Sequence, residues 1–166
     1  MILAIDVDYR EHEAVAAGVA FRYWMDSTPS VTLTTTVSPI EAYEPGAFYK
    51  RELPCLQAVI KEYNKICSIP ITCIIVDGYV WLTKDKPGLG HKLFEILPDK
   101  IPVIGVAKTS YKETDATPVY RGDSKIPLHI SSDGMDVSLA AKLVQNMHGD
   151  FRLPTLLKLV DQTCRK

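Results

Sequence analysis

The sequence predicts an α/β fold in which helices pack on one mixed β-sheet. Three runs suited to strands come early and close together, at residues 1–9, 13–24 and 31–37, and this spacing favours an antiparallel meander. Helical and strand periodicities then alternate, as in strand–helix–strand units with parallel strands. A meander followed by such units requires a mixed sheet. We expect one domain, residues 1–166, because 166 residues fit a domain of ordinary size.

Each element is supported by its own residue pattern. The run 31–37 is rich in Thr and Val, which suits a strand. Pro54 is tolerated in a first helical turn, and apolar residues follow it at helical spacing: Leu56, Val59, Ile60 and Tyr63. The polar segments 83–87 and 110–117 are expected to be loops. The remaining expected elements are strands at 71–76, 101–107, 119–121 and 127–131, and helices at 89–97, 137–147 and 153–164.

Composition and charge exclude several classes of protein. The chain is 46% hydrophobic and 23% charged, which argues against long disorder, collagen and coiled coil. It shows no apolar run of membrane-spanning length and no basic start typical of a signal peptide, so we expect a soluble cytoplasmic protein. The four cysteines form no C-x-x-C pair and lack a histidine at zinc spacing, so we expect free thiols in a reducing compartment.

The net charge restricts how the chain can bind a polyanion. Nineteen Lys and Arg residues against twenty Asp and Glu residues give a formal charge of -1. Proteins that bind nucleic acid through its phosphates usually carry a basic stripe, and the composition shows none. A polyanion-binding surface must therefore be local, or must use metal ions and backbone amides.

Acidic residues at the predicted strand ends are the first candidates for a functional site. Asp6 and Asp8 share one face of the first strand, and Asp77 follows the apolar run that ends at residue 76. With Glu52 they would form an all-oxygen cluster of the kind that suits Mg²⁺ or Mn²⁺. Lys108 ends the next buried run and would neutralise charge on a phosphoryl group. Each residue also has an ordinary explanation, as an ion pair, a turn cap or a solvated charge.

Several short segments occur in a fixed order along nearly the whole chain. They are Asp6-Val7-Asp8-Tyr9, Tyr43-Glu44-Pro45-Gly46, Arg51-Glu52, Val76-Asp77-Gly78, the run from Pro102 to Lys108, the pair of segments at 119–121 and 127–131, and Arg152-Leu153-Pro154. Each segment alone is a weak signal, but the ordered set resembles the endonuclease V family, which has a ribonuclease H-like fold. The resemblance implies a Mg²⁺-dependent nuclease, in which Mn²⁺ can substitute, that cuts DNA or RNA 3′ to deoxyinosine or inosine.

The resemblance also assigns roles to particular positions. Asp6, Glu52 and Asp77 match the family's metal-binding acids, and Lys108 matches its active-site lysine. Glycines let a backbone approach an extruded base closely and offer amides to its edge. The remaining matches are Tyr43 and Pro45 on the loop that separates the strands, and Gly46, Gly78, Gly88 and Leu89 in segments that form the hypoxanthine pocket.

Three departures from the family pattern affect these assignments. The strand-separating loop carries Glu44 where the family usually has isoleucine, and His91 falls one position early. Met135 stands where the family usually has a histidine near the metals. Asp136 is our first choice to replace that histidine as a ligand, and Asp133 is the second. The alternative, which is the more common role for this residue type, is that Asp136 only caps the helix at 137–147.

Three functional hypotheses therefore remain open from the sequence. The leading one is a metal-dependent endonuclease specific for deoxyinosine or inosine, acting as a monomer on nucleic acid. The second is a nucleic-acid-binding protein on the same fold that has lost cleavage, which Met135 and Glu44 favour. The third is an α/β domain whose acids make only structural salt bridges. Activity with Mg²⁺ on an inosine-containing strand separates the first hypothesis from the other two.

Overall fold

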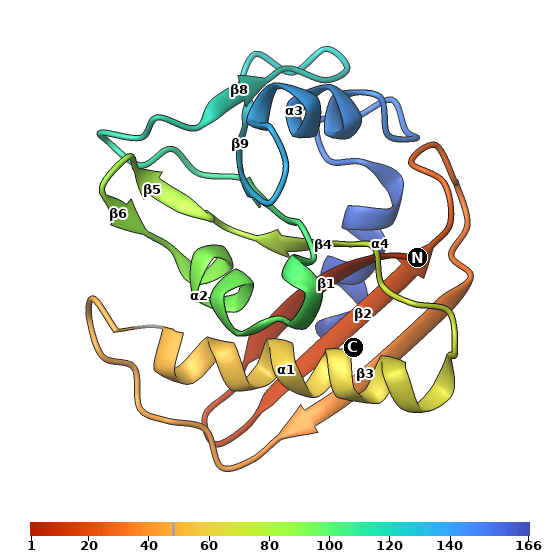
Figure 1. The fold of residues 1–166 in the computed structure, drawn as a ribbon, viewed down its shortest axis with the longest axis vertical. Helices are drawn as coiled ribbons and strands as arrows, with labels where there is room; N and C mark the ends of the chain where they lie inside the picture. The colour runs from red at the N-terminus through yellow and green to blue at the C-terminus, as the bar shows by residue number, and fades with distance from the viewer. Residues whose placement is uncertain (48) are drawn as a thin grey trace.

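A seven-stranded mixed sheet forms the centre of the molecule (Figure 1). The structure is a computed structural model, and it describes residues 1–47 and 49–166. The sheet contains β1 (Ile2–Tyr9), β2 (Ala14–Phe21), β3 (Val31–Val37), β4 (Cys73–Asp77), β7 (Val103–Ala107), β8 (Thr117–Val119) and β9 (Leu128–Asp133). Their order across the sheet is β3-β2-β1-β4-β7-β9-β8.

The direction of each strand decides which residues meet at one edge. β1, β2 and β3 form the expected antiparallel meander, and β4 and β7 then lie parallel to β1. β9 runs antiparallel to β7, and β8 pairs antiparallel with β9. The carboxyl ends of β1, β4 and β7 therefore lie at one edge, called here the catalytic edge, which is where open α/β sheets bind ligands.

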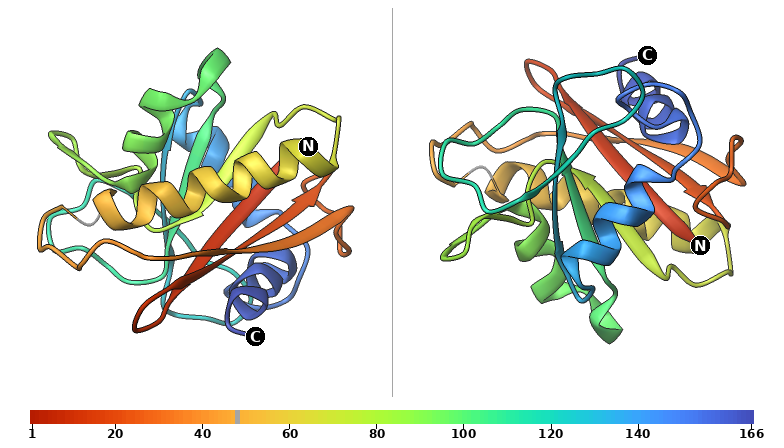
Figure 2. Two further views of the ribbon diagram at one scale, coloured as in Figure 1. Left: turned by 90° about the horizontal axis from the view of Figure 1, so that it is seen from below. Right: turned by 90° about the horizontal axis from the view of Figure 1, so that it is seen from above.

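Helices cover both faces of the sheet, as Figure 2 shows. One face packs against α1 (Tyr49–Ile66) and α2 (Leu89–Ile96), and the other packs against α3 (Val137–Gln145) and α4 (Thr155–Cys164). The side chains of each strand alternate between the two faces. In β1, for example, Leu3 and Ile5 lie in the core under α1, whereas Ile2 and Ala4 lie in the core under α4.

Close packing of α1 on the sheet depends on a glycine. A Cβ atom at Gly18 in β2 would lie 2.7 Å from Cγ1 of Val59, so no larger residue fits without moving the helix. α1 begins at Tyr49, five residues before Pro54, and not at the proline as the sequence pattern indicated. A proline at this depth removes one backbone hydrogen bond, and the buried face of the helix continues through it at Cys55, Leu56, Val59 and Tyr63.

The structure differs from the sequence prediction most in the short elements. The segment 83–87, expected to be a loop, contributes to a small hairpin of β5 (Trp81–Thr83) and β6 (Lys86–Pro87). β8 ends at Val119, where the pattern predicted a strand starting, and β9 extends to Asp133. β5, β6 and β8 have three residues or fewer, which is too short to show a periodic pattern. β9 ends in polar residues, so its hydrophobic pattern stops before the strand does.

No helix within residues 1–47 and 49–166 is long and apolar enough to cross a membrane. The cysteines are free thiols, as the sequence predicts: Cys55, Cys67, Cys73 and Cys164.

Candidate active site at the catalytic edge

Asp6, Asp77 and Lys108 meet at the catalytic edge because their strands are parallel neighbours. Ile5 of β1 lies opposite Val76 of β4, so Asp6 and Asp77 follow side by side. Lys108 follows β7 directly. Its Nζ atom lies 4.0 Å from Oδ2 of Asp6 and 3.7 Å from Oδ2 of Asp77.

A third carboxylate comes from α4, and the sequence analysis missed it. Nζ of Lys108 donates a hydrogen bond to Oδ1 of Asp161 at 3.1 Å, and Nη2 of Arg165 lies 3.2 Å from the same oxygen. Asp161 is the only acidic residue in α4, and it follows buried Val160 on a helix whose other face is apolar. This position is the feature of the sequence that could have identified Asp161, because an acid at the border of a buried helix face needs a cationic partner.

Glu52 reaches the same place from the first turn of α1, on the opposite face of the sheet. It lines a cavity of about 60 Å³ together with Asp6 and Asp77. Three of the four candidate catalytic residues therefore share one cavity wall, and the fourth, Lys108, contacts two of these acids. The remaining lining residues are Ile5, Val7, Tyr9, Leu56 and Leu89.

The carboxyl groups of this cluster are harder to ionise than ordinary ones. Burial and the neighbouring Asp77 together raise the pKa of Asp6 to about 7, against the opposing effect of Lys108. Burial also raises the pKa of Glu52 to about 7, against the effect of Arg51, and it raises the pKa of Asp77. Burial alone would lower the pKa of Lys108, but the three acids around it hold that pKa above its ordinary value. Lys108, Arg51 and Arg165 offset only part of the rise in the carboxyl pKa values, and a further cation beside the acids would favour their charged forms.

The donor chemistry of the cluster fits a hard divalent ion. All candidate ligands are carboxylate oxygens, which Mg²⁺ and Mn²⁺ prefer. Within the described residues, no group of three or more His, Cys, Asp or Glu side chains is arranged closely enough to hold a metal ion. In this arrangement Lys108 lies within 4.0 Å of Asp6, Asp77 and Asp161 and supplies the positive charge.

The raised pKa of Asp6 predicts a stability that falls as pH rises. Between the ordinary value of 3.8 and about 7, the folded protein keeps a proton that the unfolded chain has lost. The free energy of unfolding therefore decreases across this range. Between about pH 4 and about pH 8, we expect the free energy of unfolding of the wild type to fall by roughly 2–4 kcal/mol more than that of Asp6→Asn. Urea unfolding at each pH measures this difference. Parallel pH profiles for the two proteins would contradict this expectation.

A larger cavity adjoins the acids and contains three residues of the predicted base pocket. It measures about 230 Å³ and is lined by Glu52, Asp77, Gly78, Tyr79, Leu82, Gly88 and Leu89. Gly78 has φ +115°, a conformation that other residues rarely adopt, and this turn directs the chain from β4 over the cavity. The structure therefore brings Gly78, Gly88 and Leu89 next to the acids.

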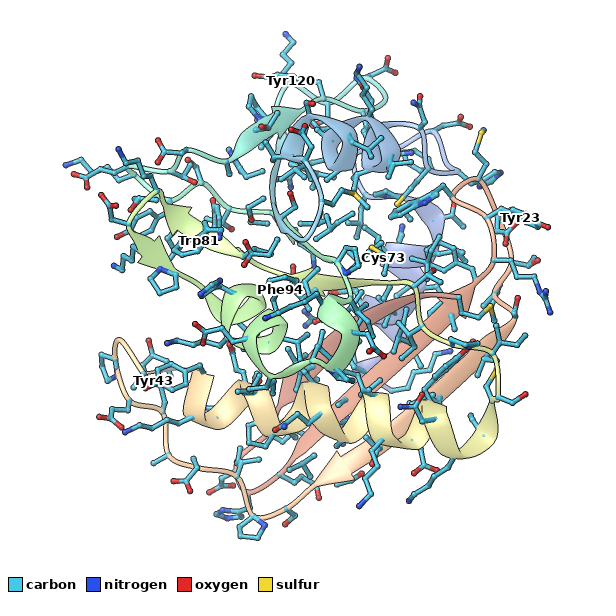
Figure 3. The ribbon with its side chains drawn as sticks, viewed as in Figure 1. Tyr23, Tyr43, Cys73, Trp81, Phe94 and Tyr120 are labelled. Carbon is cyan, nitrogen blue, oxygen red and sulfur yellow. The ribbon has the colours of Figure 1, made fainter. Side chains whose placement is uncertain are left out.

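The predicted strand-separating loop lies outside these cavities. Tyr43 and Pro45 are exposed on the segment before α1, and the Tyr43 side chain is 66% exposed (Figure 3). Gly46, which was predicted to belong to the base pocket, is exposed on the same segment and does not line the cavity. Glu44 in the same loop pairs with Lys50, at 3.3 Å between Oε2 and Nζ. The negative charge that seemed unfavourable at a nucleic-acid-binding tip is therefore partly neutralised within the loop.

The structure does not bring Asp136 to the cluster. Asp133 pairs with Val103 at the start of β7, so this end of β9 lies at the sheet edge opposite Lys108. Asp136 instead caps α3, accepting a hydrogen bond from the Ser138 backbone N–H at 2.8 Å, and bonds from Ser138 lower its pKa. The antiparallel direction of β9, which the sequence pattern did not define, explains the difference.

His91 and Asp133 form a separate polar contact. Nδ1 of His91 lies 2.6 Å from Oδ2 of Asp133, and the Trp81 indole donates to Oδ1 of the same residue at 2.9 Å. The His91 and Trp81 rings lie 4.2 Å apart between centroids, tilted by 40° to each other. These contacts attach the β5–β6 hairpin, which begins at Trp81, to α2 and β9. Met135 packs half-buried against the core under α3 and α4.

Tyr79 joins the segment after Asp77 to the segment after Lys108. Its hydroxyl donates to the Thr109 carbonyl at 2.8 Å and accepts from the Tyr111 N–H at 3.0 Å. We expect Tyr79→Phe to remove both bonds while keeping the ring, so the Tyr111 amide should exchange its hydrogen about 5–30-fold faster. Native-state hydrogen exchange measures this, with amides of α3 as the control. An unchanged Tyr111 rate would show that this contact does not hold the segment.

The fold and the acid cluster together define a ribonuclease H-like domain with carboxylates at the ends of its parallel strands. No protein-family model and no curated protein matches the sequence. Solved endonuclease V structures do match, and they confirm the predicted fold.

The first is the endonuclease V of Ciona intestinalis in complex with a 24mer DNA containing an inosine followed by a ribo-adenosine. It is 19% identical over 99% of this chain and 84% of that chain, with a TM-score of 0.84. The human protein is 20% identical over 99% and 82%, with a TM-score of 0.79. The endonuclease V of Streptomyces avermitilis is 23% identical over 99% and 79%, with a TM-score of 0.75.

Proposed function

We propose that this chain is a divergent endonuclease V: a metal-dependent phosphodiester hydrolase that cuts nucleic acid 3′ to deoxyinosine or inosine. The observation that carries the proposal is the convergence of Asp6, Glu52, Asp77 and Lys108 beside a cavity of about 230 Å³. The solved relative from Ciona intestinalis, which shares the fold, holds DNA containing an inosine.

The carboxylates would hold the metal ion. Asp6, Glu52 and Asp77 are its ligands in this proposal, with Mg²⁺ as the natural ion and Mn²⁺ as a substitute. Asp161 lies in the same ion-pair network and is a candidate for a fourth ligand. When bound, the metal supplies an activated water and polarises the phosphoryl oxygen. Lys108 then neutralises the charge that develops on the transferred phosphoryl group.

The adjoining cavity would take the extruded base. Leu82 and Leu89 offer apolar contact to its faces, and Gly78 and Gly88, which have no side chain, let the backbone approach the base closely. Tyr43 is exposed, as a side chain that fills the gap left by an extruded base should be. These placements support a base pocket next to the hydrolytic site.

A binding protein without cleavage is the second candidate. It is favoured by the contacts of Lys108, whose Nζ atom lies 3.1 Å from Asp161, 3.7 Å from Asp77 and 4.0 Å from Asp6 and so occupies carboxylates that the nuclease would need as ligands. The two candidates differ in one experiment. Labelled oligonucleotides with deoxyinosine or inosine are incubated with the protein and Mg²⁺, with undamaged strands and EDTA as controls. Cleavage of only the modified strands supports the nuclease, and metal-independent binding without a product supports the alternative.

We expect Tyr43→Ala to reduce discrimination between inosine-containing and undamaged strands. Stacking on an exposed aromatic ring contributes about 1–3 kcal/mol per base, so the preference should fall roughly 5- to 150-fold. Mg²⁺ affinity should stay unchanged, because Tyr43 lies outside the acid-lined cavities. Competition binding and metal titration measure the two quantities. A parallel loss of both would mean that Tyr43 only supports the fold.

A further inference from the structure

An aromatic side chain that has no part in the proposed site is exposed beside the catalytic edge. Phe151 is 72% exposed, in the segment between α3 and α4. This segment lies at the catalytic edge because Ala107 of β7 pairs with His129 of β9, which places the start of β9 and the end of β8 at this edge. A Cβ atom at Gly122, three residues after β8, would lie 3.3 Å from Cα of Phe151.

The backbone around Phe151 is held rigidly by a buried arginine. Arg121 is 5% exposed, and its guanidinium donates to carbonyls on both sides of this position. The acceptors are the carbonyl oxygens of Gln145 at 3.3 Å, Met147 at 2.6 Å, Gly149 at 3.0 Å, Phe151 at 2.5 Å and Arg152 at 3.3 Å. An exposed ring on a segment fixed in this way loses little freedom when it binds a partner.

The same segment is connected to the catalytic lysine. Nη2 of Arg152, the residue after Phe151, donates to the carbonyls of Lys108 and Pro127. Phe151 therefore stands one residue from a direct link to Lys108.

Positive charge lies beside the ring on α4. Nζ of Lys158 is 6.0 Å from the centroid of the Phe151 ring. Lys158 precedes Asp161 by three residues, so the two side chains share one face of the helix. Asp161 bonds Lys108 at 3.1 Å. The ring, the ammonium group and the acid cluster therefore follow one another along the same side of the molecule.

We propose that Phe151 and Lys158 form a contact for single-stranded nucleic acid next to the cleavage site. The ring stacks an unpaired base, and the ammonium binds an adjacent phosphate. Sequence-independent binding of single strands uses this combination of an aromatic platform and a cation. The choice of nucleic acid as the partner rests on the proposed function. A local contact of this kind would let a chain of net charge -1 bind a polyanion.

The test measures binding without cleavage. Fluorescence anisotropy gives the Kd for an undamaged single-stranded oligonucleotide in EDTA, for the full chain and its variants. Phe151→Ala should weaken binding about tenfold, and Phe151→Trp should restore it. Lys158→Gln should reduce the slope of log Kd against log salt by about 0.7. Ile66→Ala is the matched control, because Ile66 is 56% exposed at the end of α1, on the other face of the sheet.

The outcomes separate this contact from the proposed function. Wild-type binding that depends on Phe151 supports the contact, whether or not inosine-containing strands are cut. Unchanged affinity in Phe151→Ala overturns the contact even if cleavage is confirmed, and so does a wild type that binds no single strand. Circular dichroism of each variant shows that the fold is intact, and rescue by tryptophan excludes a general loss of structure.

Discussion

Asp77→Asn is expected to abolish Mg²⁺-dependent cleavage while leaving the fold intact. Asparagine has nearly the same shape as aspartate, and the Asp77 side chain is 42% exposed, so the free energy of unfolding should change little. The substitution removes the negative charge of one of the proposed metal ligands. Removal of a residue that only supports a metal ligand already lowers metal affinity or activity about 10–100-fold. Loss of a ligand charge should therefore lower the cleavage rate by at least roughly 10³-fold.

The measurement is single-turnover cleavage of an inosine-containing strand at saturating Mg²⁺, with chemical unfolding in parallel. Asp123→Asn is the matched control, because Asp123 is exposed and lies outside the acid cluster. A cleavage rate within about threefold of the wild type would show that Asp77 has no catalytic role, because each tenfold change in rate corresponds to about 1.4 kcal/mol of activation free energy.

Arg121→Ala is expected to be the most destabilising single substitution considered. Five backbone carbonyls lose their donor, and burial lowers the pKa of this guanidinium, which shows how little water surrounds it. Loss of one partner from a buried charged network costs about 3–5 kcal/mol. For a chain of this size that corresponds to a fall in Tm of roughly 6–20 °C.

Thermal unfolding followed by calorimetry measures this loss. Arg121→Lys should recover only part of it, because one ammonium group cannot reach acceptors spread over residues 145–152. Lys125→Ala, an exposed position in the same loop, serves as the control. A drop of less than about 1 kcal/mol for Arg121→Ala would show that water replaces the guanidinium at these carbonyls.

The sequence predicted the parts of the site that follow long apolar strands. Asp6 and Asp77 sit on or directly after runs whose length defines a buried strand, and parallel neighbours bring such residues to one edge. Lys108 follows from the same reasoning. Glu52 was added to these acids as a carboxylate from the following helix, and the resemblance supported that choice, although its local sequence looks like an ordinary solvated charge.

The parts of the fold and site that could not be predicted depend on the direction of a strand and on tertiary packing. Asp136 was assigned to the metal site because it follows Met135, which stands where the family usually has a histidine. The assignment fails because β9 runs antiparallel to β7, a direction that the sequence does not show. Asp161 was missed because its partner Lys108 is 53 residues away, and helical periodicity does not say which helix crosses the catalytic edge. The hairpin of β5 and β6 is too short to give a periodic signal.

The origin of the acids has a consequence for the order of events during synthesis. Asp6 comes from the first strand, Asp77 from the middle of the sequence and Asp161 from α4. Chains fold as they are made, with the N-terminal part available first. A nascent chain would hold Asp6 in place long before its counterparts exist, so the meander can form on the ribosome without a working centre. In the proposed nuclease, hydrolytic capacity would therefore arise late, once the strands that carry Asp77 and precede Lys108 have joined the sheet.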